Sequence, residues 1–384
     1  MLGLTNIVKF TPPQPKTYIV KIDQNNPDPL ACCTYEGDAS SMTKGSSEWD
    51  DIFGYKPCIM MNGVVKGYLN PNDFSKYEDG SVAPITDKNH DVMIEFPRMG
   101  LDISTSGKVI TIKLTDAKDD SNFQYLAYKR GNIQKDYFYL GAYNAAIDSR
   151  AGGGSGSSTN ISLFSNSGVM PLVNTSITDF INYAHNRGSG YDIMGFYQWT
   201  YVQALYVMKY GNLNSQAALG KGYVDGSAAQ MTGATDDKGM CYGNPNSDTD
   251  RVKLFGLEDA WGNIYQWLGG LYCDSSFNLL TKTSNFTDGT TASDYNYSTP
   301  SGLSGNIGGW MKQLQGTNGG GFIGKQTGGS STTYWSDYNN VAAGYFAYVG
   351  GDWFGGNNVG LFYYYMFSDA SYAYRNLGSR LMYL

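Results

Sequence analysis

The stretch GLEDAWGNIYQWLGG, residues 256–270, says more about the fold than any other part of this 384-residue sequence. Gly262 predicts a turn that a residue with a Cβ atom could not make. Trp261 and Trp267 are large apolar side chains of the kind that hold a loop-rich domain together. We therefore expect this stretch to form a buried frame and not a catalytic centre.

Two stretches near the end of the chain have the same character. They are GGDW at 350–353 and YRNLGSRLMYL at 374–384. Trp353 predicts another buried anchor. Arg380 stands between small residues and the apolar Leu381, which predicts a buried pairing with backbone or with a carboxylate. Glu258 and Asp259 are its candidate partners.

Together these stretches resemble the sulfatase-modifying-factor (formylglycine-generating enzyme) branch of the C-type lectin fold. Residues 256–270 are similar to its GLxDMxGNVWEW signature, and the final stretches to its RGGSW…RxxxGFRLV closing segment. Residues 196–222 look like the helical part of phage tail and receptor-binding proteins with this fold. The resemblance implies an α+β protein whose C-terminal domain, 160–384, has the C-type lectin fold with many loops.

Residues 17–150 predict a small, mostly antiparallel β domain that follows an N-terminal arm of residues 1–16. Asn62-Gly63 is a hairpin signal. AGGGSGSSTN at 151–160 is interpreted as a domain boundary or as a long loop of the next domain. The expected strands are short runs rich in β-branched and aromatic residues, at 17–23, 56–70, 91–97, 108–114 and 123–130.

Two helices are expected after residue 177. Thr178 is a candidate N-cap for a helix from Asp179 through His185 that ends near Gly188. An apolar stripe at helical spacing then runs from Phe196 to Met208 and is closed by Gly211.

Composition excludes several classes of function. A net charge of -7 and a pI near 4.9 argue against general binding of nucleic acid or of anionic membranes. No apolar run is long enough to span a membrane, so we expect no membrane insertion. The first residues lack a basic leader followed by an apolar stretch, so we expect synthesis in a cytoplasm without a signal peptide.

The last forty residues are unusually aromatic. Residues 345–384 contain eight Tyr, mixed with Gly, Ser, Asp and Asn. This is the composition of antibody binding loops, in which Tyr gives large contact area at low entropic cost. The alternative is a Tyr-rich β core, but the mixture of Tyr with polar residues favours an exposed recognition face. We expect an aromatic ligand-binding surface here.

Residues 327–384 contain no Lys, Glu or Gln. Randomising the adenines of Asn codons gives Tyr, Ser, Asp, Phe, Gly, Arg and Ala, but not Lys, Glu or Gln. The segment therefore resembles the variable region, about 330–384, of diversity-generating retroelement proteins. On that resemblance the ligand-binding residues are Tyr345, Ala347, Tyr348, Asp352, Phe354, Asn357, Tyr363, Tyr365, Ser368, Asp369, Ser371, Tyr372, Tyr374, Arg375 and Asn376.

Catalysis is not expected. Oxidases of the resembling branch hold copper with two cysteines near the C-terminus, whereas the last cysteine here is Cys273. His90 and His185, the two histidines, are too far apart in sequence to predict an iron site. No cofactor is expected. Calcium is the one alternative, through Asp248, Asp250 and Glu258, or through Asn263 and Ile264 as in some relatives, although Gln266 replaces their acidic residue.

These observations predict a receptor-binding protein of a phage or prophage tail, located in the virion. Its partners would be a protein or glycan receptor on a host cell surface and structural proteins of the virion, and a homotrimer is one candidate state. Two alternatives remain: a metal-dependent oxidase of the sulfatase-modifying type, and a bacterial adhesin located at the cell surface.

Overall fold

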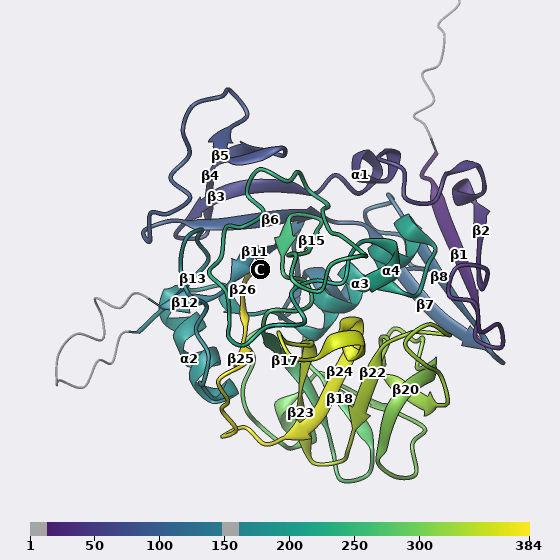
Figure 1. Cartoon of the computed structure of the whole chain (residues 1–384). Coiled ribbons are helices and arrows are strands. Elements are labelled where there is room, and N and C mark those ends of the chain that lie inside the picture. Colours follow the sequence, from purple (N-terminus) through teal and green to yellow (C-terminus); the bar gives the residue numbers. More distant parts are fainter. Residues whose placement is uncertain (1–13, 148–160) are drawn as a thin grey trace, which may run out of the picture.

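The computed structural model describes residues 14–147 and 161–384 (Figure 1). The expected linker at 151–160 and most of the expected N-terminal arm lie outside these ranges. The described chain is an α+β structure in which strands predominate and one apolar core extends through both ranges.

A four-stranded antiparallel sheet begins the described chain. It contains β1 (Thr17–Asp23), β2 (Cys33–Gly37), β7 (Gly100–Ser106) and β8 (Val109–Thr115), in the order β2-β1-β8-β7. β8 confirms the strand predicted at 108–114: Ile110, Ile112 and Leu114 are buried while the residues between them are half-buried, so one face of the strand packs on the core.

A seven-stranded sheet crosses the boundary predicted at 151–160. Its order is β14-β26-β11-β6-β3-β4-β5, so the last strand of the chain pairs with β11. The sheet curls so that the β3–β4 turn reaches β14 at its other edge, where the Gly63 amide donates to the Tyr191 hydroxyl at 3.1 Å. The strands are β3 (Lys56–Met61), β4 (Val64–Asn70), β5 (Asp73–Tyr77), β6 (Asp91–Pro97), β11 (Tyr137–Asn144), β14 (Tyr191–Ile193) and β26 (Arg380–Tyr383).

The strand predicted at 123–130 is wrong for most of its length. A 3-10 turn occupies Leu126–Tyr128. On either side of it, Gln124 forms a single bridge with Leu101, and β9 (Lys129–Arg130) pairs with β10 (Ile133–Gln134). The Tyr125 and Tyr128 hydroxyls donate to the backbone oxygens of Ala117 and Pro97 at 2.9 and 2.7 Å. These buried bonds hold the segment in a turn that β propensity does not predict.

Both predicted helices are present. Helix α2 (Ile177–Arg187) starts two residues earlier than expected, because Ser176 and not Thr178 accepts from the Asp179 amide. Helix α3 (Phe196–Tyr210) ends at Gly211, which has the left-handed conformation. Two shorter helices are α1 (Glu48–Phe53) and α4 (Ser215–Ala218). Among the described residues, no helix is both long and apolar enough to cross a membrane.

The third large sheet has nine strands and carries the aromatic segment. Its order is β19-β18-β17-β23-β24-β22-β20-β21, with β25 (Leu377–Gly378) added parallel to β17. In Figure 1 its C-terminal strands lie at the bottom, opposite α1 and β3–β5. The strands are β17 (Tyr265–Cys273), β18 (Asn278–Thr281), β19 (Tyr297–Pro300), β20 (Ile307–Leu314), β21 (Gly324–Thr327), β22 (Tyr338–Val341), β23 (Tyr345–Gly350) and β24 (Gly360–Ser368).

Candidate functional site: an aromatic surface on strands β23 and β24

Strand β24 separates its aromatic side chains onto two faces. Phe362, Tyr364 and Met366 are fully buried, and the Tyr364 hydroxyl donates to Gln203 Oε1 of α3 at 3.1 Å. Side chains alternate along a strand, so Tyr363, Tyr365 and Phe367 lie on the opposite face of the sheet. That face carries the candidate site.

The rings on this face pack against rings of β23. Tyr348 is paired with Tyr365, and their rings stack with centroids 4.9 Å apart. Tyr345 and Phe367 stack at the same separation. Tyr372 and Tyr374, in the segment that follows β24, lie nearly parallel to each other at 6.3 Å. We call these residues the aromatic surface: Tyr345, Tyr348, Tyr363, Tyr365, Phe367, Tyr372 and Tyr374.

Exposure differs across the surface. Phe367 and Tyr374 are each 48% exposed and Tyr372 is 39% exposed, whereas Tyr348 and Tyr363 are buried. The outer rings therefore offer contact area, and the inner rings support them.

The fifteen predicted binding residues are not all exposed, which corrects the expectation of a wholly exposed face. Burial follows from the strand positions, since inner residues of β23 and β24 are covered by neighbouring rings. Whether any of them contacts a ligand stays a prediction. The buried members are Ala347, Tyr348, Asp352, Tyr363 and Ser368; the half-buried ones are Tyr345, Tyr365 and Asn376; the exposed ones are Phe354, Asn357, Asp369, Ser371, Tyr372, Tyr374 and Arg375.

Sequence reasoning missed Tyr265 and Phe367. Tyr265 begins β17, and its ring lies 5.1 Å from Tyr348 while its hydroxyl lies 3.3 Å from that of Tyr363. Burial raises the pKa values of Tyr265, Tyr348 and Tyr363, so these hydroxyls remain neutral hydrogen-bonding groups. Alternate residues of a strand lie on the same face, so the positions of Tyr363 and Tyr365 predict that Phe367 lies beside them. The sequence holds no comparable signal for Tyr265.

The segment 369–376 is fixed at both ends. The Ser371 amide and hydroxyl donate to Asp369 Oδ1 at 2.9 and 2.7 Å, and these bonds lower the pKa of Asp369. At the other end, Asn376 Nδ2 donates to Asp352 Oδ2 at 2.5 Å. Tyr372 and Tyr374 are thus presented by a hydrogen-bonded turn.

Phe354 and Asn357 are held apart from the rest of the predicted set. Phe354 is 81% exposed, and within the described chain its ring stacks on no ring of the aromatic surface. Its neighbour Trp353 is buried, and the Trp353 carbonyl accepts from the Gly226 amide at 2.7 Å. Asn357 lines a shallow hollow with Asn214 and Gln216. These two residues would form a separate contact region.

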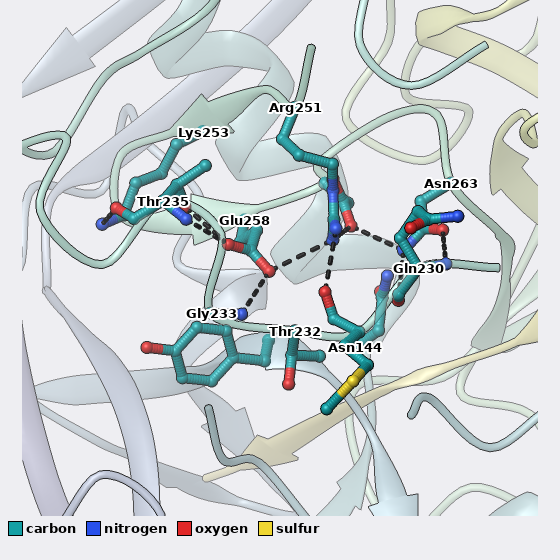
Figure 2. Close-up of polar contacts among 12 residues, drawn as sticks. Asn144, Gln230, Thr232, Gly233, Thr235, Arg251, Lys253, Glu258 and Asn263 are labelled. Atoms are coloured by element: carbon teal, nitrogen blue, oxygen red, sulfur yellow. Dashed lines mark hydrogen bonds and ion pairs between the residues drawn. The ribbon is translucent and has the colours of Figure 1, made fainter. Parts of the chain in front are cut away.

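A buried polar network holds the frame beneath the site (Figure 2). Arg251 Nε donates to Asp259 Oδ1 at 2.6 Å, and its Nη2 contacts Glu258 at 3.2 Å. Glu258 also accepts from the Gly233 and Thr235 amides, both at 2.8 Å. Burial raises the pKa of Glu258, and Arg251 opposes that rise. The carboxylates of the signature stretch therefore serve a structural ion pair.

Arg380 is fully buried beside this network, as predicted. It donates to the Glu258 carbonyl at 2.6 Å, the Gly141 carbonyl at 2.7 Å and Gln266 Oε1 at 3.0 Å. Its partners are thus backbone oxygens and an amide, while the carboxylates of Glu258 and Asp259 pair with Arg251. Burial lowers the pKa of Arg380 to about 10, which leaves it charged at neutral pH.

The residues named for calcium are engaged elsewhere. Asp248 pairs with Lys221 at 2.9 Å, Asp250 accepts from Asn244 at 2.8 Å, and Glu258 pairs with Arg251. In the described ranges, no three His, Cys, Asp or Glu side chains gather as metal ligands would. Asn263 Nδ2 donates to Asp259 at 2.8 Å, so this amide also serves the network.

The thiols and imidazoles do not fit the copper or iron centres of the resembling oxidases. Cys273 is buried, and the two thiols that lie together are Cys32 and Cys33, with their sulfurs 3.7 Å apart on the first sheet. His90 lies beside Asp87 at 3.1 Å and His185 beside Asp192 at 3.4 Å, so each imidazole contacts a carboxylate and not the other histidine.

No family model matches the chain, and no curated protein matches it. Similar solved structures include the Major Tropism Determinant M1 variant, at 11% identity and a TM-score of 0.32 over 89% of this chain and 73% of that one. PvdO from Pseudomonas aeruginosa is 13% identical over 76% and 94%, with a TM-score of 0.30. Treponema denticola variable protein 1 is 10% identical over 77% and 95%, also with a TM-score of 0.30.

Proposed function

We propose that this chain is a ligand-binding protein that recognises a host-cell receptor, protein or glycan, through the aromatic surface and performs no chemistry there. The observation that carries the proposal is the stacking of Tyr345 and Phe367 on paired strands, with Phe367 half exposed. Rings that are already packed lose little conformational entropy when a ligand binds. More of the free energy gained from their contact area therefore contributes to affinity.

The polar residues around the rings suit recognition. Asp369, Ser371 and Arg375 are exposed next to Tyr372 and Tyr374. A rim of hydrogen-bonding groups around aromatic anchors is the usual composition of an interface. The buried Tyr348 and Tyr363 would set the positions of the outer rings without contacting the ligand.

We further propose that residues 160–384 have the C-type lectin fold, that residues of about 330–384 are diversified by a retroelement, and that the protein belongs to a phage or prophage tail. The support is sequence: the motifs at 256–270 and 350–384, and the absence of Lys, Glu and Gln after residue 326. Virion proteins would be its other partners, in a homotrimer, with no nucleic acid and no cofactor. A surface adhesin would use the same face.

The test of diversification is the DNA beside the gene. We expect a near-copy of the last part of the coding sequence that differs at adenines, together with a reverse transcriptase gene. Their absence would contradict diversification and leave the binding proposal standing.

The test of binding uses labelled protein and a panel of bacterial strains. Saturable binding to some strains is expected, and protease or periodate treatment of those cells would distinguish a protein from a glycan receptor. Absence of binding to every strain, with correctly folded protein, would count against a cell-surface receptor.

A further inference from the structure

A polar cleft lies on the side of the molecule opposite the aromatic surface. It has a volume of about 840 Å³ and lies between α1, strands β3–β5 and the segment 238–241. Helix α1 and strands β3–β5 lie at the top of Figure 1. Its walls include Asp50, Tyr55, Lys56, Glu78 and Cys241. Small solutes can therefore reach the thiol of Cys241.

Cys241 differs from the other cysteines in its exposure. Cys32, Cys33, Cys58 and Cys273 are all buried. The hydrogen bond with Cys32 and burial raise the pKa of Cys33, and burial raises the pKa values of Cys58 and Cys273. Cys241 is part-exposed on the cleft wall. Oxidation of a thiol depends on access as well as on its chemistry, so Cys241 is the cysteine that a dissolved oxidant meets first.

An amine lies beside this thiol. Lys209, in the last turn of α3, is 3% exposed, and its Nζ is 3.8 Å from Cys241 Sγ. The same Nζ donates to Asp50 Oδ1, which also accepts from the Tyr55 hydroxyl. Tyr55 Oη lies 4.0 Å from Cys241 Sγ. Thiol, amine and carboxylate are thus held together by three different segments, and among the described residues no second thiol is bonded to Cys241.

We propose that Cys241 and Lys209 are an oxidative cross-linking site that takes hydrogen peroxide as oxidant. In the first step the thiol becomes a sulfenic acid: sulfur loses two electrons, the O–O bond of the peroxide breaks, and one water leaves. In the second step the Lys209 nitrogen, after giving a proton to Asp50, attacks the sulfur. An S–N bond forms, the S–O bond breaks, and a second water leaves.

The chemistry of the neighbours selects this outcome. A sulfenic acid condenses with the nearest nucleophile, commonly a thiol or a nitrogen. Here the neighbours are the Lys209 nitrogen and the phenols of Tyr55 and Tyr210. The Tyr55 hydroxyl is bonded to Asp50, and burial raises the pKa values of both phenols. The resulting sulfenamide would tie the end of α3 to the segment 238–241 across the cleft wall. A thiol reductant would reverse it.

Peptide mapping of the intact protein tests the proposal. After treatment with peroxide, trypsin should release residues 188–221, uncut at Lys209, joined to residues 239–251. The joined pair should weigh about 2 Da less than the sum of its parts, which is the mass of the two hydrogens lost. Dithiothreitol should restore the separate peptides.

Three variants make the test specific. Lys209→Arg keeps a cation next to Asp50 and should abolish the cross-link while Cys241 still forms a sulfenic acid that a dimedone probe captures. Asp50→Asn should slow cross-linking at least about tenfold and leave dimedone capture unchanged. Cys273→Ser, at a buried thiol, should cross-link like the parent. Cys241 oxidised to sulfinic acid in the parent without any joined peptide, or a cross-link that persists in Lys209→Arg, would overturn the proposal.

Discussion

The ring of Phe367 stacks on the ring of Tyr345 with centroids 4.9 Å apart and an angle of 18° between the ring planes. The two residues belong to different strands, β24 and β23, and the stack therefore fixes the positions of two rings that face solvent. Aromatic pairs of this kind contribute about 0.5–1.5 kcal/mol beyond the apolar area that they bury.

A double-mutant cycle should detect this stack. Phe367→Ala and Tyr345→Ala are each expected to destabilise the fold modestly, and the double variant by about 0.5–1.5 kcal/mol less than the sum of the single variants. Unfolding in urea gives the three free energies. Additive effects would show that the stack contributes nothing to the free energy of unfolding.

Replacing Arg380 should be far more damaging than replacing the exposed Arg375. Arg380→Met leaves the carbonyls of Gly141 and Glu258 buried without their donor, and we expect a loss of about 3–5 kcal/mol. Arg375→Met should stay within about 0.5 kcal/mol of the parent. Urea unfolding measures both, and equal losses would contradict the assignment of Arg380 to the frame.

Gly262 can be compared with Gly80 to separate crowding from backbone strain. Both glycines have left-handed φ, at +78° and +84°, but a Cβ at Gly262 would lie 3.0 Å from Tyr223 backbone atoms, whereas one at Gly80 meets open space. Gly80→Ala should cost about 1 kcal/mol from strain alone. Gly262→Ala should cost more, by about 1–3 kcal/mol. An equal loss of unfolding free energy in the two variants would show that the close approach to Tyr223 adds nothing to the cost of the substitution.

The pair of His185 and Asp192 should make stability depend on pH. The hydrogen bond to Asp192 raises the pKa of His185, with the two atoms 3.4 Å apart. A pKa that is higher in the folded state stabilises below the ordinary value of about 6.5, and the effect is lost as pH rises through the folded pKa. The melting temperature should therefore fall between about pH 6 and pH 8, and His185→Gln should flatten that slope. An unchanged slope would contradict this assignment. Burial raises the pKa of Asp192 above its ordinary value. Stability should therefore also fall as pH rises through the lower range in which this carboxyl group loses its proton.

Calcium should not stabilise the protein. Glu258 is paired with Arg251 inside the network, so a cation already neutralises the carboxylate that calcium would need. Differential scanning fluorimetry with millimolar calcium or with EDTA should give the same melting temperature. A rise with calcium that depends on Asp248 or Asp250 would overturn this expectation.

Much of the fold could be predicted because its signals are local. A run of β-branched residues located β8, the Asn62-Gly63 turn located the β3–β4 hairpin, and the apolar stripe located α3. What failed depends on distant contacts. The turn at 126–128 is held by the bond from the Tyr128 hydroxyl to Pro97, which is 31 residues away in the sequence, and β26 joins β11 across more than two hundred residues. No local pattern encodes such pairings.

The candidate site was predictable as a segment but not residue by residue. Composition located the aromatic segment, but it did not show which of its side chains face the core and which lie on the other face of the sheet. The register decides that Tyr364 packs on α3 while Tyr365 and Phe367 lie on the other face. Tyr265 joins the site only because β17 pairs with β23.

Binding of exposed-ring variants to a strain that the parent protein recognises tests the proposed function most directly. Phe367→Ala, Tyr372→Ala and Tyr374→Ala should each weaken binding at least about tenfold, or roughly 1.4 kcal/mol, while the protein stays folded at the assay temperature. The matched controls are Tyr137→Ala and Tyr297→Ala, at exposed tyrosines on other strands, and their affinity should stay within about twofold of the parent. Parental affinity in all three surface variants, or an equal loss in the controls, would contradict recognition by the aromatic surface.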